Sequence, residues 1–119
     1  MPLSRVDPAN YTELLAEKCS RVAAMFAPFT APEPEVFASK PTSFRMRAEF
    51  RIWHEGDDLN YVMFRPEDPA TPVPIERFPI ASERIQRLMP VLRDTLKGNE
   101  VLRHRLFQVE FLSTRSGDT

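Results

Sequence analysis

The sequence predicts an α+β fold, in which a mostly antiparallel sheet of three or four strands has two helices packed on it. Apolar and charged side chains alternate in residues 44–54, the pattern of a strand with one buried face. Gly56 and Asp57 follow at once and suit the tight turn of a β-hairpin. Apolar residues recur at helical spacing in residues 11–27 and 82–97. A chain of 119 residues supports a single domain, residues 1–119, with a modest core.

The first helix is expected to begin after Asp7 or Asn10, either of which can cap it, and to end before Pro28. Residues 28–41 contain four prolines, so we expect an extended segment there. The apolar stripe of the helix consists of Tyr11, Leu14, Leu15, Val22 and Phe26, with Cys19 and Met25 beside it.

The strand at residues 44–54 has two unlike faces, because successive side chains point to opposite sides. One face is apolar, and the other consists of Arg45, Arg47, Glu49, Arg51 and Trp53. A two-residue turn at Gly56 and Asp57 fixes the register of the hairpin. It should pair His54 with Leu59, Ile52 with Tyr61 and Phe50 with Met63, and on the other face Arg51 with Val62 and Glu49 with Phe64.

Three further elements follow. Residues 73–78 form a short strand at best, at a sheet edge because it contains proline. Ser82 can cap a second helix that leaves at Gly98, and Pro90 should kink or shorten it, at a cost of about 3 kcal/mol if unrelieved. A last strand is expected at residues 104–114, where both faces are partly apolar. Such a strand suggests that more sheet follows it.

Charge is distributed unevenly along the chain. The formal net charge of -1 lacks the bulk positive charge of a dedicated nucleic-acid binder. Residues 40–54 nevertheless contain four lysines and arginines against one acid, whereas residues 55–68 contain five acids against one arginine. A basic strand therefore leads into an acidic hairpin end.

Cysteine and histidine are too scarce for several kinds of site. Cys19 is the only cysteine, so no intramolecular disulfide is possible and a cytoplasmic location is expected. Its place on the helical stripe favours a buried structural thiol over a nucleophile. His54 and His104 are too few for a typical zinc site, so no metal is expected. No segment approaches the roughly 20 apolar residues of a membrane span, so we expect no membrane partner.

Two groups of residues allow both a functional and a structural interpretation. Arg45, Arg47, Arg51 and Trp53 could bind phosphates and bases of RNA, or form a solvated strand face with ion pairs worth at most about 1 kcal/mol. Phe107 could be a core residue. Its place after Arg103, His104 and Arg105 also suits a side chain that stacks on RNA bases.

Several segments of the chain resemble one known family. The longest is residues 45–58, Arg-Met-Arg-Ala-Glu-Phe-Arg-Ile-Trp-His-Glu-Gly-Asp-Asp. Three shorter segments precede it in the same order as in the family. They are residues 15–18, Leu-Ala-Glu-Lys, residues 25–29, Met-Phe-Ala-Pro-Phe, and residues 34–37, Pro-Glu-Val-Phe. Residues 101–108, Val-Leu-Arg-His-Arg-Leu-Phe-Gln, and 112–114, Leu-Ser-Thr, complete the set. Together they resemble the N-terminal part of the tRNA (uracil-5-)-methyltransferases, which make 5-methyluridine in the T loop.

This resemblance implies that RNA recognition and catalysis reside in different domains. Family members are longer and carry a glycine-rich S-adenosylmethionine loop, an Asp-Pro-Pro segment, a cysteine nucleophile in a Ser-Cys-Asn context and a late glutamate base. None of these motifs occurs here, so residues 1–119 would be the N-terminal RNA-recognition domain of a longer enzyme whose catalytic domain is absent. The chain itself would then hold no catalytic or cofactor-binding residue, and S-adenosylmethionine would bind elsewhere in the parent protein.

The resemblance also implies roles for individual residues. The family's front domain grips the T arm of tRNA, and the positions of Arg51 and Phe107 are among those that meet the loop. Arg47 and Arg51 would steer phosphates or base edges, His104 and Arg105 would support the loop, and Phe107 would stack.

Two other classes of function stay open at this level. The face with Trp53, Val62 and Phe64 could dock a protein partner, and exposed sheet edges could pair two copies of the chain. An independent small enzyme is a third reading, for which no convergent nucleophile, base and orienting group can be named.

Overall fold

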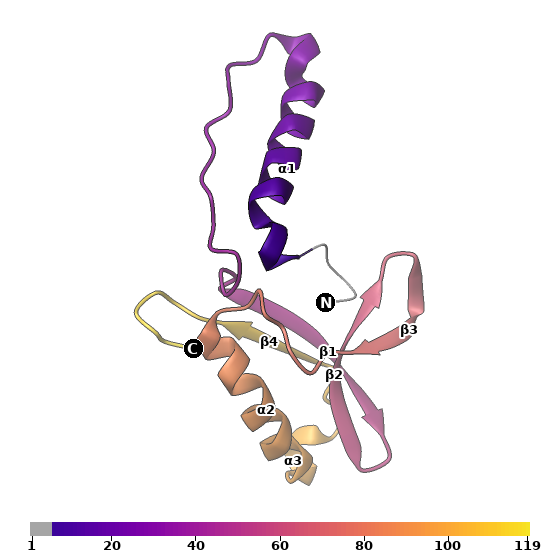
Figure 1. The fold of residues 1–119 in the computed structure, drawn as a ribbon. Coiled ribbons are helices and arrows are strands. Elements are labelled where there is room, and N and C mark those ends of the chain that lie inside the picture. Colours follow the sequence, from indigo (N-terminus) through magenta and orange to yellow (C-terminus); the bar gives the residue numbers. More distant parts are fainter. Residues whose placement is uncertain (1–5) are drawn as a thin grey trace.

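The computed structural model describes residues 6–119 as a four-stranded antiparallel sheet with helices (Figure 1). The strands lie in the order β3-β2-β1-β4, so the predicted α+β class is confirmed. Their bounds are β1 Arg47–Glu55, β2 Asp58–Arg65, β3 Asp68–Pro74 and β4 Gln108–Leu112. The helices are α1 Tyr11–Phe26, α2 Glu83–Lys97 and the short α3 Glu100–Arg103, with 3-10 turns at Pro8–Asn10 and Ala27–Phe29.

The hairpin of β1 and β2 has the register that its turn residues predict. Gly56 has a φ of +59°, which glycine adopts without the strain that a side chain would cause. The observed pairs include His54 with Leu59, Ile52 with Tyr61 and Arg51 with Val62. Every second residue of β1 from Ala48 to Ile52 is buried, and the residues between them are exposed.

The outer strands differ from the expected bounds. β3 begins earlier than expected, and a bulge between Met63 and Arg65 interrupts its pairing with β2. It contains three prolines, which an edge strand tolerates because one side makes no ladder hydrogen bonds. β4 is shorter than the expected residues 104–114, and it begins late because Arg105 has a φ of +56°, which interrupts extended structure.

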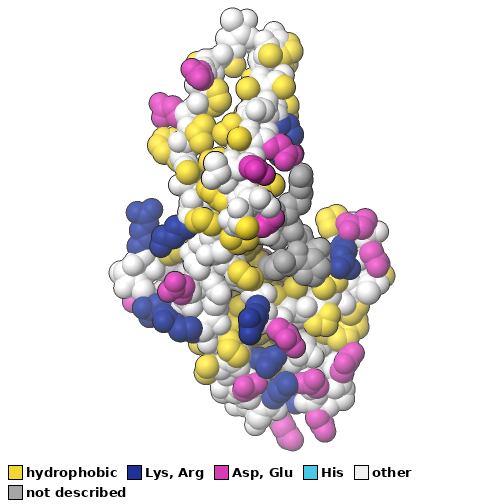
Figure 2. All heavy atoms as spheres, viewed as in Figure 1, with side chains coloured by type: hydrophobic (Ala, Val, Ile, Leu, Met, Phe, Trp, Pro, Cys, Tyr) yellow, Lys and Arg dark blue, Asp and Glu magenta, His cyan; other side chains and the backbone are white. Residues whose placement is uncertain are grey.

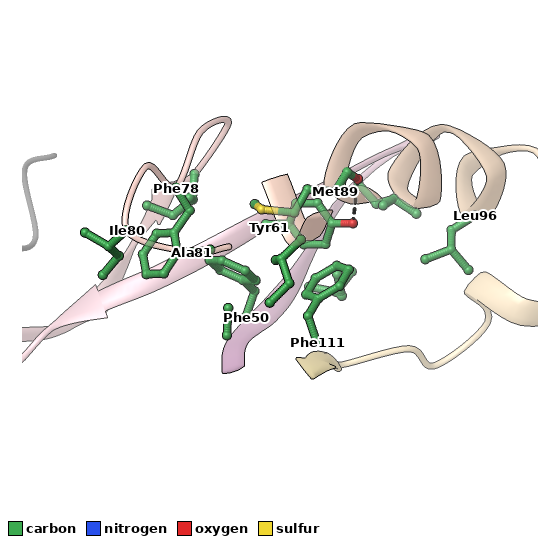
Figure 3. Close-up of a cluster of buried hydrophobic side chains, with 13 residues drawn as sticks. Phe50, Tyr61, Phe78, Ile80, Ala81, Met89, Leu96 and Phe111 are labelled. Atoms are coloured by element: carbon green, nitrogen blue, oxygen red, sulfur yellow. Dashed lines mark hydrogen bonds between the residues drawn. The ribbon is translucent and has the colours of Figure 1, made fainter. Parts of the chain in front are cut away.

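The core lies between α2 and the inner face of the sheet (Figure 3), and Phe50 is at its centre. Phe50 is 1% exposed. Its ring centroid lies 5.3 Å from that of Tyr61, 5.1 Å from that of Phe78 and 6.1 Å from that of Phe111. From the helix, α2 contributes the buried residues Ile85, Met89 and Leu96.

Helix α2 runs unbroken through Pro90, so this proline does not shorten it as expected. Pro90 is exposed, and the buried Tyr61 hydroxyl donates a 2.7 Å hydrogen bond to the carbonyl of the preceding Met89. At the N-terminus of α2, Ser82 caps as predicted, because its Oγ accepts from the amide of Ile85 at 3.3 Å. The expected packing of a helix on the sheet therefore holds for α2.

Helix α1 does not lie on the sheet. It projects away from the strands, and the segment after it returns alongside (Figure 1). None of its residues is buried, and Cys19 is half-buried rather than part of the core. Figure 2 shows hydrophobic side chains gathered on the surface of this projection. Its apolar stripe predicted a helix correctly, but a stripe does not specify which partner covers it.

The free energy of unfolding at alkaline pH should depend on the ionisation of Tyr61. Burial raises the pKa of this residue from 10.0 to about 12. The folded state then holds the proton more tightly than the unfolded state, so the stabilisation is complete below pH 10 and is lost as the pH rises towards 12. The loss amounts to about 3 kcal/mol. Urea unfolding at stepped pH should show this loss in the native chain, and Tyr61→Phe should lack most of it.

Tyr11→Phe is the matched control, because the Tyr11 hydroxyl lies 3.2 Å from the Ser39 hydroxyl on the surface. This variant should keep the full alkaline loss. Equal pH dependence in Tyr61→Phe and the native chain would contradict the assignment.

Candidate nucleic-acid interface

The outer face of β1 carries two of the predicted RNA-binding arginines at different places along the ladder. Arg47 lies opposite Leu112 of β4, whereas Arg51 lies opposite Gln108 of β4 and Val62 of β2. Both arginines are exposed. Their surroundings differ, and this difference decides which of them is available to a ligand.

Arg47 is engaged by two carboxylates. Its Nε donates to Oε1 of Glu110 at 2.5 Å, and its Nη2 lies 3.6 Å from Oε2 of Glu49. The hydrogen bond to Glu110, followed by the charge of that residue, raises the pKa of Arg47 above its ordinary value. A phosphate would have to displace Glu110 to reach this guanidinium.

Arg51 has no such partner. Within residues 6–119 its guanidinium makes no hydrogen bond or ion pair, and Glu49, the acid two residues away on the same face, contacts Arg47 instead. An exposed guanidinium without a partner can bind a phosphate through two parallel hydrogen bonds. Of the two arginines of β1, Arg51 is therefore the one that is available to a ligand.

Beside Arg51 lies a small aromatic cluster that we call the outer cluster, consisting of Trp53, Val62 and Phe64. The Trp53 and Phe64 rings meet edge to face, with centroids 6.4 Å apart and an interplanar angle of 69°. Val62 lies on the same face, diagonal to Trp53 and two residues before Phe64, and only 1% of it is exposed. Trp53 itself stays 40% exposed.

A loop at residues 104–107 joins α3 to β4 next to the turn of the β1–β2 hairpin. Arg103 fixes its start, because Nη1 donates to the carbonyl of Asp57 at 2.9 Å and to the carbonyl of Lys97 at 3.1 Å. Asn99 caps the preceding α3 by accepting from two amides of its first turn. The hairpin turn, the end of α2 and the start of the loop are thereby tied at one point.

The end of the loop is fixed by β1. The His54 ring nitrogen Nε2 lies 2.7 Å from the carbonyl oxygen of Leu106, and the amide of Ile52 donates to the carbonyl of Phe107 at 2.8 Å. His54 is thus a loop-anchoring residue, a role that its place beside the turn did not predict. The side chains of His104, Arg105 and Phe107 remain exposed.

Phe107 is 61% exposed, so it is not the core residue that an apolar strand would ordinarily contain. The next residue, Gln108, pairs with Arg51. Phe107, His104 and Arg105 therefore lie at the end of the β1–β4 ladder where Arg51 is found, and Arg47 lies at the other end. Exposed cations and an exposed ring thus share this end of the ladder.

Other kinds of site find no support in the described part of the chain. Residues 6–119 contain no group of three or more histidine, cysteine, aspartate or glutamate side chains placed to hold a metal ion. No helix in the same range is long and apolar enough to span a bilayer.

Comparison with known proteins places the chain in a family. A sequence model described as tRNA (Uracil-5-)-methyltransferase matches residues 10–119. The chain belongs to the tRNA (uracil-5-)-methyltransferase family. The resemblance of its segments to that family is thereby confirmed.

Individual relatives agree with this assignment. A tRNA/tmRNA (uracil-C(5))-methyltransferase from Dechloromonas aromatica is 57% identical over 99% of this chain and 33% of its own length. Proteins of the same description from Aromatoleum aromaticum and Vibrio cholerae are 51% and 52% identical over 99% and 95% of this chain. The chain thus spans about a third of the length of these methyltransferases, and that third is the N-terminal one.

Loss of the Arg103 contacts should loosen the loop without unfolding the sheet. Arg103→Gln removes a charged donor shared by two carbonyls, worth about 1.5 kcal/mol or more. The amide of Ile52, which bonds to Phe107, should then exchange with deuterium about tenfold faster or more. Mass-spectrometric hydrogen exchange measures this without any ligand.

Arg87→Gln, an exposed site on α2, is the control and should leave exchange at Ile52 unchanged. If residues 52–57 and 104–107 exchange alike in Arg103→Gln and Arg87→Gln, the Arg103 contacts do not hold the loop.

Proposed function

We propose that this chain is the RNA-recognition portion of a tRNA (uracil-5-)-methyltransferase. It grips the T arm of tRNA while a C-terminal catalytic domain methylates carbon 5 of the T-loop uridine. The observation that carries the proposal is that a member of this family has an unpartnered Arg51 at the same end of its sheet as the exposed Phe107. A reducing cytoplasm, where tRNA is found, is the proposed location and suits a chain with one cysteine.

The chemistry of the site supports an RNA ligand. Arg51 and Arg105 are exposed cations, and guanidinium binds phosphate and stacks on bases. Phe107 can insert beside an unstacked base and replace part of the stacking lost when a target nucleotide is flipped out, which is worth about 1–3 kcal/mol. His104 is exposed beside Arg105 and adds a hydrogen-bond donor that supports the RNA loop. In this scheme Arg47 contacts RNA only after exchanging Glu110 for a phosphate.

Catalysis is assigned to the rest of the parent protein. S-adenosylmethionine supplies the methyl group in such enzymes, but the residues described here do not fit it. The three glycines, Gly56, Gly98 and Gly117, lie in separate turns and cannot build a glycine-rich loop. Cys19 lies on α1, which projects on the side of the molecule away from α3 (Figure 1), so it is not proposed as a nucleophile.

A protein-docking role is the second candidate, and one observation favours it. The β4 edge is open and Leu112 on that strand is 62% exposed, so a second copy or another protein could add a strand there. The outer cluster is a weaker docking surface than the sequence indicates, because Val62 is already buried.

Salt dependence separates the two candidates. Binding of a T-arm hairpin RNA to the native chain should weaken steeply with salt, because phosphate contacts release counterions. Arg51→Gln should lower the slope of log affinity against log salt by about 0.7–0.9, the value for one phosphate contact. Fluorescence anisotropy of a labelled hairpin at four or more salt concentrations measures both slopes.

Arg87→Gln again serves as the control and should keep the native slope. A hairpin with a scrambled loop should bind more weakly than the true T arm. If the native chain binds neither hairpin, or if Arg51→Gln keeps the full slope, recognition of RNA through Arg51 is wrong.

A further inference from the structure

The exposed ring of Trp53 has no role in the core or in the proposed phosphate contact. It packs edge to face on Phe64, yet 40% of it remains exposed. It lies on the same face of β1 as Arg51, two residues further on, which is about 7 Å along the strand. An exposed indole next to an unpartnered guanidinium is a combination that recognises a flat ring attached to an anion.

The charges around the outer cluster set the orientation of such a ligand. Beyond Trp53 the hairpin tip carries Glu55, Asp57 and Asp58. Asp58 is compensated by an ion pair with Lys97, which lowers its pKa, but Glu55 and Asp57 have no ion pair within the described residues. A phosphate is therefore repelled from the tip and attracted towards Arg51.

The opposite direction along β1 is closed to a second phosphate. Arg47, the next arginine on that face, is occupied by Glu110 and Glu49. Next to each other on β1, the outer face thus offers the unpartnered guanidinium of Arg51 and the exposed ring of Trp53, which is enough for a single nucleotide.

We propose that Trp53 is a stacking site for one unpaired RNA base whose phosphate is bound by Arg51. This inference rests on the proposed function and adds a second base-stacking position to it. Phe107 stacks at the loop, whereas Trp53 receives a base on the outer face of the sheet. Phe64 braces the indole from its edge, and the acidic tip fixes the direction in which the RNA strand runs.

The composition of the chain provides a direct readout. Trp53 is the only tryptophan, so the indole fluorescence of the protein reports on this residue alone. The experiment titrates the native chain with a T-arm hairpin carrying a dye and records the indole emission and the anisotropy of the dye in parallel. Stacking should quench the emission, and both signals should saturate with the same Kd.

Two variants test whether the contact contributes to affinity. Trp53→Leu should bind the hairpin roughly five- to hundredfold more weakly. Trp53→Phe keeps an aromatic ring at this position and should retain most of the affinity. Thermal unfolding of both variants shows whether the fold survives, and the fluorescence arm needs no variant at all.

The results that would contradict the stacking site differ from those that would contradict the proposed function. Binding seen by anisotropy without any change in indole emission would overturn the stacking site and leave the proposed function standing. If Trp53→Leu folds and binds the hairpin as tightly as the native chain, the stacking site is likewise overturned and the proposed function stands. No binding by anisotropy would overturn the proposed function and this inference with it.

Discussion

The period of two in β1 is the constraint on which the rest of the structure depends. Because successive side chains point to opposite faces, Phe50 and Ile52 enter the core while Arg51 and Trp53 face outwards. The core cannot form around Phe50 without presenting Arg51 on the other side. A shift of one residue in the register would exchange the two sets, so the packing of the core also fixes the interface.

The loop that carries Phe107 depends on the same strand. Its backbone is bonded to Ile52 and lies within hydrogen-bonding distance of His54, and its start is tied through Arg103 to the hairpin turn and to α2. These contacts engage backbone carbonyls and leave the side chains of His104, Arg105 and Phe107 exposed. A loop held in this way loses little conformational freedom when a ligand binds, which favours affinity.

Local patterns in the sequence predict the parts of the fold that are set locally. The alternation in residues 44–54, the turn at Gly56 and the cap at Ser82 each depend on neighbours within a few residues. The turn and the cap were confirmed, and the strand was confirmed from Arg47 onwards. Contacts between distant residues were not predicted. Glu110 neutralises Arg47 from 63 residues away, and nothing in either segment alone indicates the pairing of β1 with β4.

Helix α1 and the loop at residues 104–107 also show that the sequence does not predict contacts between distant elements. An apolar stripe predicts a helix but does not say what covers it. The expected packing of α1 on the sheet was therefore wrong, although the helix itself was predicted correctly. Phe107 is exposed just before β4, because α3 and the positive φ of Arg105 delay the start of that strand to Gln108. The basic run before Phe107 was the one local signal of its exposure.

We propose that recognition of the T loop resides at the end of the sheet where Arg51 and Phe107 lie. The most direct measurement compares Phe107→Ala with Phe37→Ala, an 86% exposed phenylalanine of the segment after α1, for binding to a true and a scrambled T-arm hairpin. Phe107→Ala should lose the preference for the true loop while its unfolding midpoint stays close to that of the native chain, and Phe37→Ala should keep the preference. If Phe107→Ala discriminates between the two hairpins as well as the native chain does, this end of the sheet does not read the loop.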